Sequence, residues 1–218
     1  MPAYYPIFLD LNGRPCVIIG GGEVAERKIK SLRECRARVT VISPEVTPSI
    51  EEMAGRDELE WIPREYSQGD LQGVFLAIAA TDRQKVNEAI AGEAETEKVI
   101  LNVVDNTPLC TFIAPSVLKR GEVTMAISTG GASPALARKL RESLEHSEAL
   151  GYASLAEILS SARKEVKRRG IEVHPDRWQE CITTDLVSLV EAGRSQDALD
   201  KLMSMLIADG QEGARVSS

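Results

Sequence analysis

Short apolar runs alternate with amphipathic stretches over the first hundred residues. The runs have the length of buried strands and end in glycine, proline or polar residues. They predict strands at 16–19, 38–42, 59–62, 74–79 and 99–103. The apolar spacing between them predicts helices at 24–33, 47–54 and 82–95, with Val24, Ile29 and Leu32 pointing inward in the first. Strands and helices that alternate in this way predict a Rossmann-like α/β fold with a parallel sheet.

The pattern changes after residue 105. Two more strands are expected at 112–114 and 123–127, joined through Lys119-Arg120-Gly121. Ser133 and Pro134 then begin a helix with a stripe of Leu136, Leu140 and Leu144. This stretch reads as a small α+β module. The resulting division is 1–112 for the sheet domain, 113–147 for the module and 148–218 for a helical C-terminal domain.

The last part of the chain is predicted to be helical. A helix through Leu155 and Val166 should stop at Gly170. A second should run from His174-Pro175 to Gly193, and Ser195 should cap a third. Residues 210–218 have the character of a disordered terminus.

The sequence Gly20-Gly21-Gly22-Glu23-Val24-Ala25 lies between the first predicted strand and the first helix. Gly20 permits a tight turn, and Gly22 leaves room for a pyrophosphate to approach the backbone. Ala25 lets the helix pack closely on the sheet. A helix N-terminus also offers free N–H groups to an anion. Because the turn sits in a strand–turn–helix setting, it predicts a dinucleotide site.

The acidic residue that usually holds the ribose is missing at the end of the second strand. Ser43 and Pro44 stand there, followed by Glu45. We expect backbone groups or Ser43 to hold the ribose instead. No arginine follows to receive a 2′-phosphate, so NAD is favoured over NADP.

Composition narrows the function classes. The formal net charge is −7, which disfavours nucleic acid as a partner. No apolar run approaches the roughly 20 residues that span a bilayer, and no secretory signal precedes the first strand. We therefore expect a cytoplasmic protein with no membrane partner. Four cysteines without CxxC spacing and two histidines predict no metal site.

Five motifs in order resemble the siroheme synthase N-terminal family. This family comprises precorrin-2 dehydrogenases, some of which are also sirohydrochlorin ferrochelatases. The resemblance covers about residues 4–145. It is carried by Pro6-Ile7-Phe8, the glycine turn through Lys28, Ala79-Ala80-Thr81-Asp82, Asn102-Val103-Val104-Asp105 and the segment from Ser128 to Arg138.

The resemblance implies NAD-dependent oxidation of precorrin-2 to sirohydrochlorin, in some members followed by Fe²⁺ insertion. It implies a homodimer formed through the central module, with Fe²⁺ or Co²⁺ as a possible second substrate. Some relatives carry a further methyltransferase domain. The length of this chain leaves no room for one, so we expect uroporphyrinogen methylation to come from another protein.

The resemblance also implies roles for particular residues. Glu23, Val24, Pro44 and Glu45 match cofactor contacts, and Thr81 lies at the next sheet edge. Asp105 falls on the catalytic aspartate of the family. Thr129 stands where the fused enzyme has a phosphorylated serine, while the adjacent Ser128 is retained, so the resemblance does not by itself imply phosphoregulation.

The chemistry of these residue types fits that reaction. Asp105 follows a strand at its carboxyl end, where open α/β sheets bind ligands, and is our candidate general base. A turn-capping aspartate is the structural alternative. The substrate carries eight carboxylates, and we expect Ser128, Thr129, Gly130 and Arg138 to help bind it. The alternative there is an ordinary strand–helix connection.

Two other function classes remain open from the sequence. A non-enzymatic NAD-sensing module would need a partner-binding or DNA-binding element, and no basic recognition helix is evident. A metal chelatase without dehydrogenase activity would have no use for an intact glycine turn.

Overall fold

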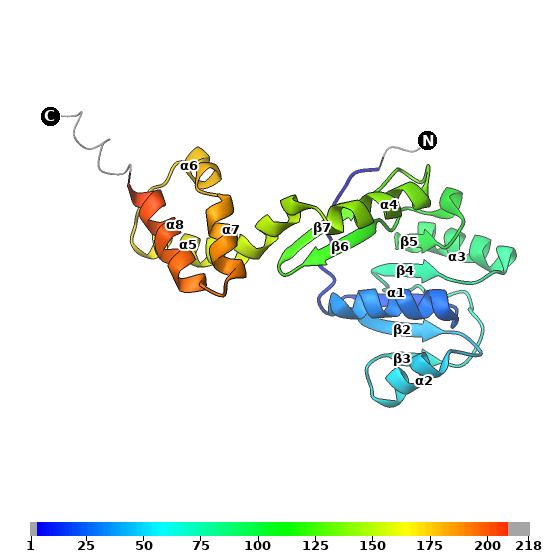
Figure 1. The fold of residues 1–218 in the computed structure, drawn as a ribbon. Helices are drawn as coiled ribbons and strands as arrows, with labels where there is room; N and C mark the ends of the chain where they lie inside the picture. The colour runs from blue at the N-terminus through cyan, green and yellow to red at the C-terminus, as the bar shows by residue number, and fades with distance from the viewer. Residues whose placement is uncertain (1–3, 209–218) are drawn as a thin grey trace. The chain divides into compact units, whose positions relative to one another are not determined.

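The computed structural model describes residues 4–208. They form two compact units, the first ending at Ala114 and the second beginning at Pro115 (Figure 1). The first unit contains a five-stranded sheet in the order β3-β2-β1-β4-β5. Every strand pair in it is parallel, which confirms the predicted Rossmann-like sheet. The strands are β1 (Pro15–Ile19), β2 (Arg38–Ile42), β3 (Glu60–Ile62), β4 (Leu76–Ala79) and β5 (Ile100–Val103).

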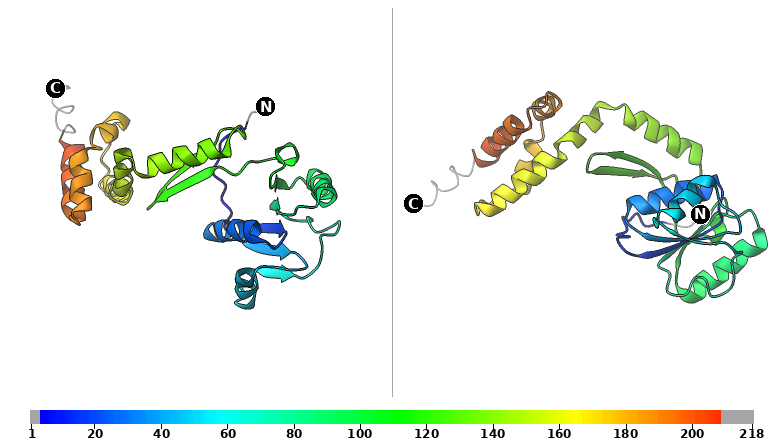
Figure 2. Two further views of the ribbon diagram at one scale, coloured as in Figure 1. Left: turned by 45° about the vertical axis from the view of Figure 1, so that its right-hand side comes forward. Right: turned by 90° about the horizontal axis from the view of Figure 1, so that it is seen from below.

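Helices cover both faces of this sheet (Figure 2). Helices α1 (Glu23–Glu34) and α2 (Pro48–Gly55) pack on one face, in a core that includes Ile18, Ile29 and Val41. Helix α3 (Gln84–Glu97) packs on the other face, around Ile90 and Leu101. Burying both faces explains why β1 and β4 are apolar along their length rather than alternating.

The inward face of α1 differs in one residue from the prediction. Ala25, Ile29 and Leu32 are buried, whereas Val24 is only half-buried. The buried three follow a helical spacing of four and three residues, and Val24 lies beside that face near the glycine turn. The expectation that Ala25 allows close packing on the sheet is confirmed by its complete burial.

The predicted strand at 112–114 is wrong. After β5 the chain forms a short 3₁₀ helix, η1 (Thr107–Leu109), and then passes along β5 without joining the sheet as a strand. The backbone N–H groups of Thr111 and Phe112 both donate to the Leu101 carbonyl, at 2.8 and 3.3 Å. In a β ladder, successive backbone N–H and C=O groups pair with successive groups of the neighbouring strand. Two N–H groups that share one carbonyl do not continue that pattern.

The second unit begins with an antiparallel hairpin of β6 (Ser116–Arg120) and β7 (Val123–Ile127). Lys119 and Arg120 therefore belong to a strand and not to the connection, which is Gly121-Glu122. Helix α4 (Pro134–Glu145) follows, and the Ser133 hydroxyl accepts from the Leu136 N–H at 3.2 Å, as the predicted cap requires. Its leucine stripe is exposed in the described chain.

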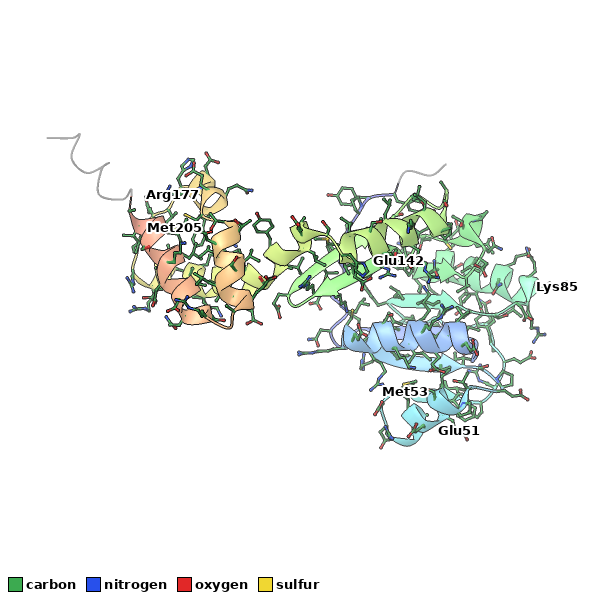
Figure 3. The ribbon with its side chains drawn as sticks, in the orientation of Figure 1. Glu51, Met53, Lys85, Glu142, Arg177 and Met205 are labelled. Carbon is green, nitrogen blue, oxygen red and sulfur yellow. The ribbon has the colours of Figure 1, made fainter. Side chains whose placement is uncertain are left out.

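The remaining helices pack around a core that includes Leu155, Leu186 and Leu202. They are the 3₁₀ segment η2 (Glu148–Leu155) and the helices α5 (Ala156–Arg168), α6 (Pro175–Glu180), α7 (Thr184–Glu191) and α8 (Ser195–Ile207). The Arg177 guanidinium of α6 donates two hydrogen bonds to the Met205 carbonyl of α8, at 2.8 and 3.1 Å (Figure 3).

The chain is helical from Glu148, as predicted, and η2 takes the 3₁₀ form. Two helix boundaries in this part correct the predictions. The helix expected from His174-Pro175 to Gly193 is broken at Cys181, which is fully buried, and α7 restarts after the β-branched Ile182-Thr183 pair. Ser195 is the first helical residue, and the cap position belongs to Arg194, whose guanidinium donates to Asp197.

No helix within residues 4–208 is both long enough and apolar enough to cross a bilayer. The predicted disorder at 210–218 lies outside the described residues. The division of the chain into three parts stays a prediction.

Candidate functional site

The carboxyl ends of β1 and β4 meet where the strand order reverses. The chain leaves β1 for β2 on one side, while β4 lies on the other side of β1. Such a switch point forms the ligand-binding crevice of open parallel sheets. The glycine turn follows β1 and Thr81 follows β4, so the structure places both at this point.

Each of the three glycines meets a different steric requirement. Gly20 has φ +117°, and a Cβ there would lie 2.3 Å from the Ala80 carbonyl oxygen. A Cβ on Gly21 would lie 2.1 Å from the Glu45 carbonyl oxygen. A Cβ on Gly22 would meet nothing within 4 Å. Gly20 and Gly21 therefore serve the fold, and the space beside Gly22 is open to a ligand.

Gly21 is a constraint that sequence reasoning missed. The standard G-x-G-x-x-G/A pattern assigns roles to the positions of Gly20, Gly22 and Ala25, and none to the position of Gly21. Here the second lets the turn touch the loop after β2, and its carbonyl accepts from the Thr47 N–H at 2.9 Å. The sign of this constraint in the sequence is that all three positions from 20 to 22 are glycine.

The N-terminus of α1 fits a dinucleotide pyrophosphate. Gly22 is the N-cap and supplies no side-chain hydrogen bond. The first intrahelical bond runs from the Glu26 N–H to the Gly22 carbonyl at 3.0 Å. The N–H groups of residues 23–25 thus have no acceptor within the helix. These donors, the dipole end and the open space at Gly22 suit an anion that approaches the backbone.

The Ser43 hydroxyl is committed to the loop after β2. It donates to the Glu45 carbonyl at 2.6 Å, and Ser43 is 8% exposed. The Trp61 indole N–H in turn donates to the Ser43 carbonyl at 2.9 Å. Pro44 and Glu45 are exposed beside it. Ser43 therefore shapes this loop, and its exposed neighbours are the groups available to a ribose.

Glu26 ties α1 to the same loop. Its carboxylate accepts from the Thr47 hydroxyl at 2.8 Å and pairs with Lys30 at 2.5 Å. The hydrogen bond from Lys30, followed by those from Thr47 and Ser49, lowers the pKa of Glu26 to about 2. Thr47 also caps α2 by accepting from the Ile50 N–H, so one hydroxyl joins two helices.

A pH dependence of stability follows from Glu26. Its pKa in the folded chain lies below the unfolded value of about 4.5, so its contribution is fully present above that pH. The contribution is lost as the pH falls toward 2. We expect Glu26→Gln to lower the thermal midpoint at pH 7, with a gap from wild type that closes between pH 4.5 and 2. A gap that stays constant with pH, measured by circular dichroism, would contradict this role.

Three contacts fix the loop after β4. The Thr81 hydroxyl accepts from the Arg83 N–H at 2.9 Å, and the buried Asn87 amide donates to the Thr81 carbonyl at 3.0 Å. Arg83 also forms an ion pair with Glu65. Thr81 is half-buried and is thus fixed at the switch point.

Asp105 occupies a turn at the carboxyl end of β5. Its φ is +58°, in the left-handed region that aspartate tolerates better than most residues. The residue is exposed. Among residues 4–208 no hydrogen bond or ion pair engages its carboxylate, so the side chain forms no turn-capping contact there. Because parallel strands end at the same sheet edge, the carboxylate shares that edge with the glycine turn and Thr81.

The remaining candidate residues lie in the second unit. The Ser128 hydroxyl accepts from the Gly130 N–H at 3.1 Å, and the Thr129 hydroxyl exchanges two hydrogen bonds with the Ser133 backbone. Gly130 has φ +65°. Arg138 is on the exposed side of α4, where it pairs with Glu142 at 2.8 Å and lowers the pKa of that carboxyl. The first three form one loop before α4.

Fold and turn together define a dinucleotide-binding protein. Residues 7–116 match the family model described as putative NAD(P)-binding, and residues 120–147 match the one described as sirohaem biosynthesis protein central. The first match covers just over half of the chain, so the chain belongs to the putative NAD(P)-binding family. The two matches in order confirm the predicted resemblance to the siroheme synthase N-terminal region.

Individual relatives agree with this family. The siroheme synthase of Chromobacterium violaceum is 37% identical over 213 residues, which are 97% of this chain and 45% of that protein. The siroheme synthase of Thioalkalivibrio sulfidiphilus is 38% identical over 206 residues, 93% of this chain and 42% of that protein. The chain thus spans less than half the length of these curated relatives.

A solved structure is similar over almost its full length. It is a precorrin-2 dehydrogenase, with a TM-score of 0.72 and 27% sequence identity. The similarity covers 91% of this chain and 98% of that one.

Proposed function

We propose that the chain is an NAD-dependent dehydrogenase that oxidises precorrin-2 to sirohydrochlorin. The observation that carries this proposal is the meeting of two features at one sheet edge. One is a helix N-terminus with free N–H groups and open space at Gly22. The other is the exposed carboxylate of Asp105, which no described residue engages. The similarity to a precorrin-2 dehydrogenase and to siroheme synthases supports the substrate.

The residues of the first unit would hold the cofactor by its phosphates and ribose. The N–H groups at Glu23 and Val24 would bind the pyrophosphate, while Pro44, Glu45 and Thr81 would line the remaining contacts. Bound NAD⁺ supplies the hydride acceptor. In this proposal the negative charge of Glu45 would lie near the ribose and repel a 2′-phosphate, which supports NAD over NADP.

Asp105 would act as the general base. Oxidation removes a hydride and a proton from the macrocycle, and the carboxylate takes the proton. A base must stay aligned with its substrate, and Asp105 lies two residues beyond β5 in a turn that the Asn106 N–H closes on the Val103 carbonyl. The exposed position leaves the carboxylate accessible.

The loop before α4 and Arg138 would bind the carboxylates of the substrate. The Ser128 hydroxyl accepts from Gly130 and so keeps its own hydrogen to donate. The Thr129 hydroxyl is used within the loop and has no such freedom. Exposure of Arg138 makes its pair with Glu142 weak, so the guanidinium can exchange partners at small cost.

We further propose that the chain acts as a homodimer in the cytoplasm. Four apolar side chains of β6 and α4 are 37–51% exposed, and they are Val117, Leu136, Leu140 and Leu144. Leu136, Leu140 and Leu144 are spaced by four residues and so share one face of α4, and an exposed apolar face marks an interaction site. A second copy of the chain would cover them.

Replacing one of these leucines by a charge tests the dimer. We expect Leu140→Glu to raise the dimer dissociation constant about 30-fold or more, because an unpaired charge buried in an interface costs about 2 kcal/mol or more. Light scattering over a dilution series measures the change. The neighbouring exposed Lys139→Glu is the control and should dimerise as wild type does. Equal dissociation of the two variants would exclude this surface.

Fe²⁺ or Co²⁺ insertion into sirohydrochlorin is a separate activity. No three His, Cys, Asp or Glu residues cluster as a metal site would require within the described part of the chain. In a chelatase reaction the ion would be a substrate that the macrocycle nitrogens take up. Product absorbance with and without the protein, compared with the spontaneous rate, measures this activity.

The test of the proposed function is anaerobic incubation with precorrin-2 and NAD⁺. We expect NADH to form, and to form faster than with NADP⁺ as the acceptor. Binding of NAD⁺ without turnover would favour the sensing module. Metal insertion without NADH formation would favour the chelatase.

A further inference from the structure

The outer edge of β5 is covered by a segment that is not a strand. β5 lies at the end of the sheet, so the N–H groups on its outer side lack a neighbouring strand. The Thr111 hydroxyl accepts from the Leu101 N–H at 2.7 Å, and the Cys110 Sγ accepts from the Val103 N–H at 3.1 Å. Side chains thus replace the missing ladder.

Cys110 reaches both sides of the Asp105 turn. Its Sγ lies 3.3 Å from the Val103 carbonyl oxygen and 3.4 Å from the Asn106 carbonyl oxygen. Val103 precedes Asp105 by two residues, and Asn106 follows it directly. The Asn106 N–H closes the turn by donating to the Val103 carbonyl at 3.2 Å. One thiol therefore connects the end of the strand with the residue beyond the aspartate.

Asn102 holds this thiol in place. Its amide nitrogen lies 3.6 Å from Cys110 Sγ and donates to the Phe112 carbonyl at 3.1 Å. Asn102 is 9% exposed, so these contacts are shielded from water. Burial also raises the pKa of Cys110, which keeps the sulfur protonated and able to donate at neutral pH. We call Cys110 and Asn102 the thiol clamp.

The clamp supports a conformation that needs support. A left-handed φ at a residue other than glycine costs roughly 1–2 kcal/mol, and the surrounding structure must supply it. Asp105 has φ +58° and its own side chain makes no local hydrogen bond among the described residues that would compensate. The contacts that fix the turn are thus those of its neighbours.

We infer that the thiol clamp positions the Asp105 carboxylate for proton removal, with Cys110 and Asn102 as positioning residues. This inference rests on the proposed function, in which Asp105 is the base. A displacement of about 1 Å at a reacting group can cost about 100-fold in rate, so a turn held on both sides matters to catalysis. The competing explanation is that the clamp only covers the sheet edge.

A double-mutant cycle separates the two explanations. We expect Cys110→Ala to lower kcat between about 10- and 100-fold, with the KM for NAD⁺ unchanged. Cys110→Ser, which keeps a donor and an acceptor, should recover most of the loss. In an Asp105→Asn background the Cys110→Ala change should have no further effect on kcat, because the base it positions is gone. The same loss in both backgrounds would overturn the inference.

Thr111→Val is the matched control. It removes the neighbouring hydrogen bond to Leu101 and leaves the thiol clamp in place, so it should lower the thermal midpoint with kcat unchanged. Asn102→Ala is the second variant, and it should reproduce the kcat loss and its absence in the Asp105→Asn background. If Cys110→Ala does not fold, the double-mutant cycle is measured with Asn102→Ala and Asp105→Asn instead.

Hydrogen exchange gives a readout that does not depend on turnover. The Val103 amide should exchange faster in Cys110→Ala than in wild type or Cys110→Ser, measured without cofactor. Faster exchange with full kcat would leave the clamp as an edge cover only and overturn the inference. Failure of the wild-type chain to form NADH would instead refute the proposed function.

Discussion

Replacing Gly22 by alanine is expected to weaken NAD⁺ binding about 30-fold or more while the fold stays intact. The added Cβ meets no protein atom within 4 Å, and the φ of −82° suits alanine. The space it fills is the space through which a pyrophosphate approaches the helix N-terminus, so the loss corresponds to about 2 kcal/mol of binding. Calorimetric titration with NAD⁺ measures the affinity, and circular dichroism monitors the fold.

Gly21→Ala is the matched control for this prediction. Its Cβ would lie 2.1 Å from the Glu45 carbonyl oxygen, so the loop after β2 must move and the thermal midpoint should fall. The two variants differ by one position and should fail in different ways, one in binding and one in folding. Gly22→Ala with the affinity of wild type would show that no phosphate lies against this turn.

The second large effect is expected from Asp105→Asn. Loss of a general base lowers kcat by about 100- to 10,000-fold, while NAD⁺ affinity should stay within about twofold of wild type. Asparagine has the same shape and also tolerates a left-handed φ, so the turn at +58° should persist. Single-turnover measurements with precorrin-2 separate the chemical step from binding.

Asp57→Asn supplies a close control. Asp57 is also an exposed aspartate, with φ +56°, but it follows α2 at the opposite end of the strands from the glycine turn. Its substitution should leave kcat unchanged. An Asp105→Asn variant with a kcat as high as that of Asp57→Asn would remove Asp105 from its assigned role.

Much of the first unit follows from local sequence. β1 and β4 are buried on both faces and are apolar along their length, so these two runs are easy to recognise. The pairs Thr47-Pro48 and Ser133-Pro134 begin helices where the capping rules place them. The glycine turn can be recognised because it follows directly after the apolar run of β1 and directly precedes α1, so one short stretch of sequence contains strand, turn and helix start.

Features that depend on distant residues were not predictable in the same way. Gly21 is required by the Glu45 carbonyl, and the Ser43 hydroxyl turns to that same carbonyl, so neither role appears before the loop is folded. Phe112 has the apolar character of a strand residue, but its segment is fixed by the side chains of Asn102 and Thr111. The periodicity of apolar residues along the sequence does not reveal such contacts between side chains and the backbone.

The candidate substrate residues show the same limit. Ser128 and Thr129 look equivalent in the sequence, yet hydrogen bonds engage Thr129 as both donor and acceptor and Ser128 as acceptor only. Their different availability comes from the loop geometry before α4. We therefore expect Ser128 to contribute more to substrate binding than Thr129.

The most direct test of the proposed function is the stoichiometry of anaerobic turnover. Precorrin-2 consumed, sirohydrochlorin formed and NADH formed are followed together by absorbance in one reaction with excess NAD⁺. Hydride transfer to the cofactor predicts one NADH for each sirohydrochlorin, with no product when NAD⁺ is omitted. Sirohydrochlorin that forms without NADH, or no sirohydrochlorin at all, would contradict the proposal that this chain is an NAD-dependent precorrin-2 dehydrogenase.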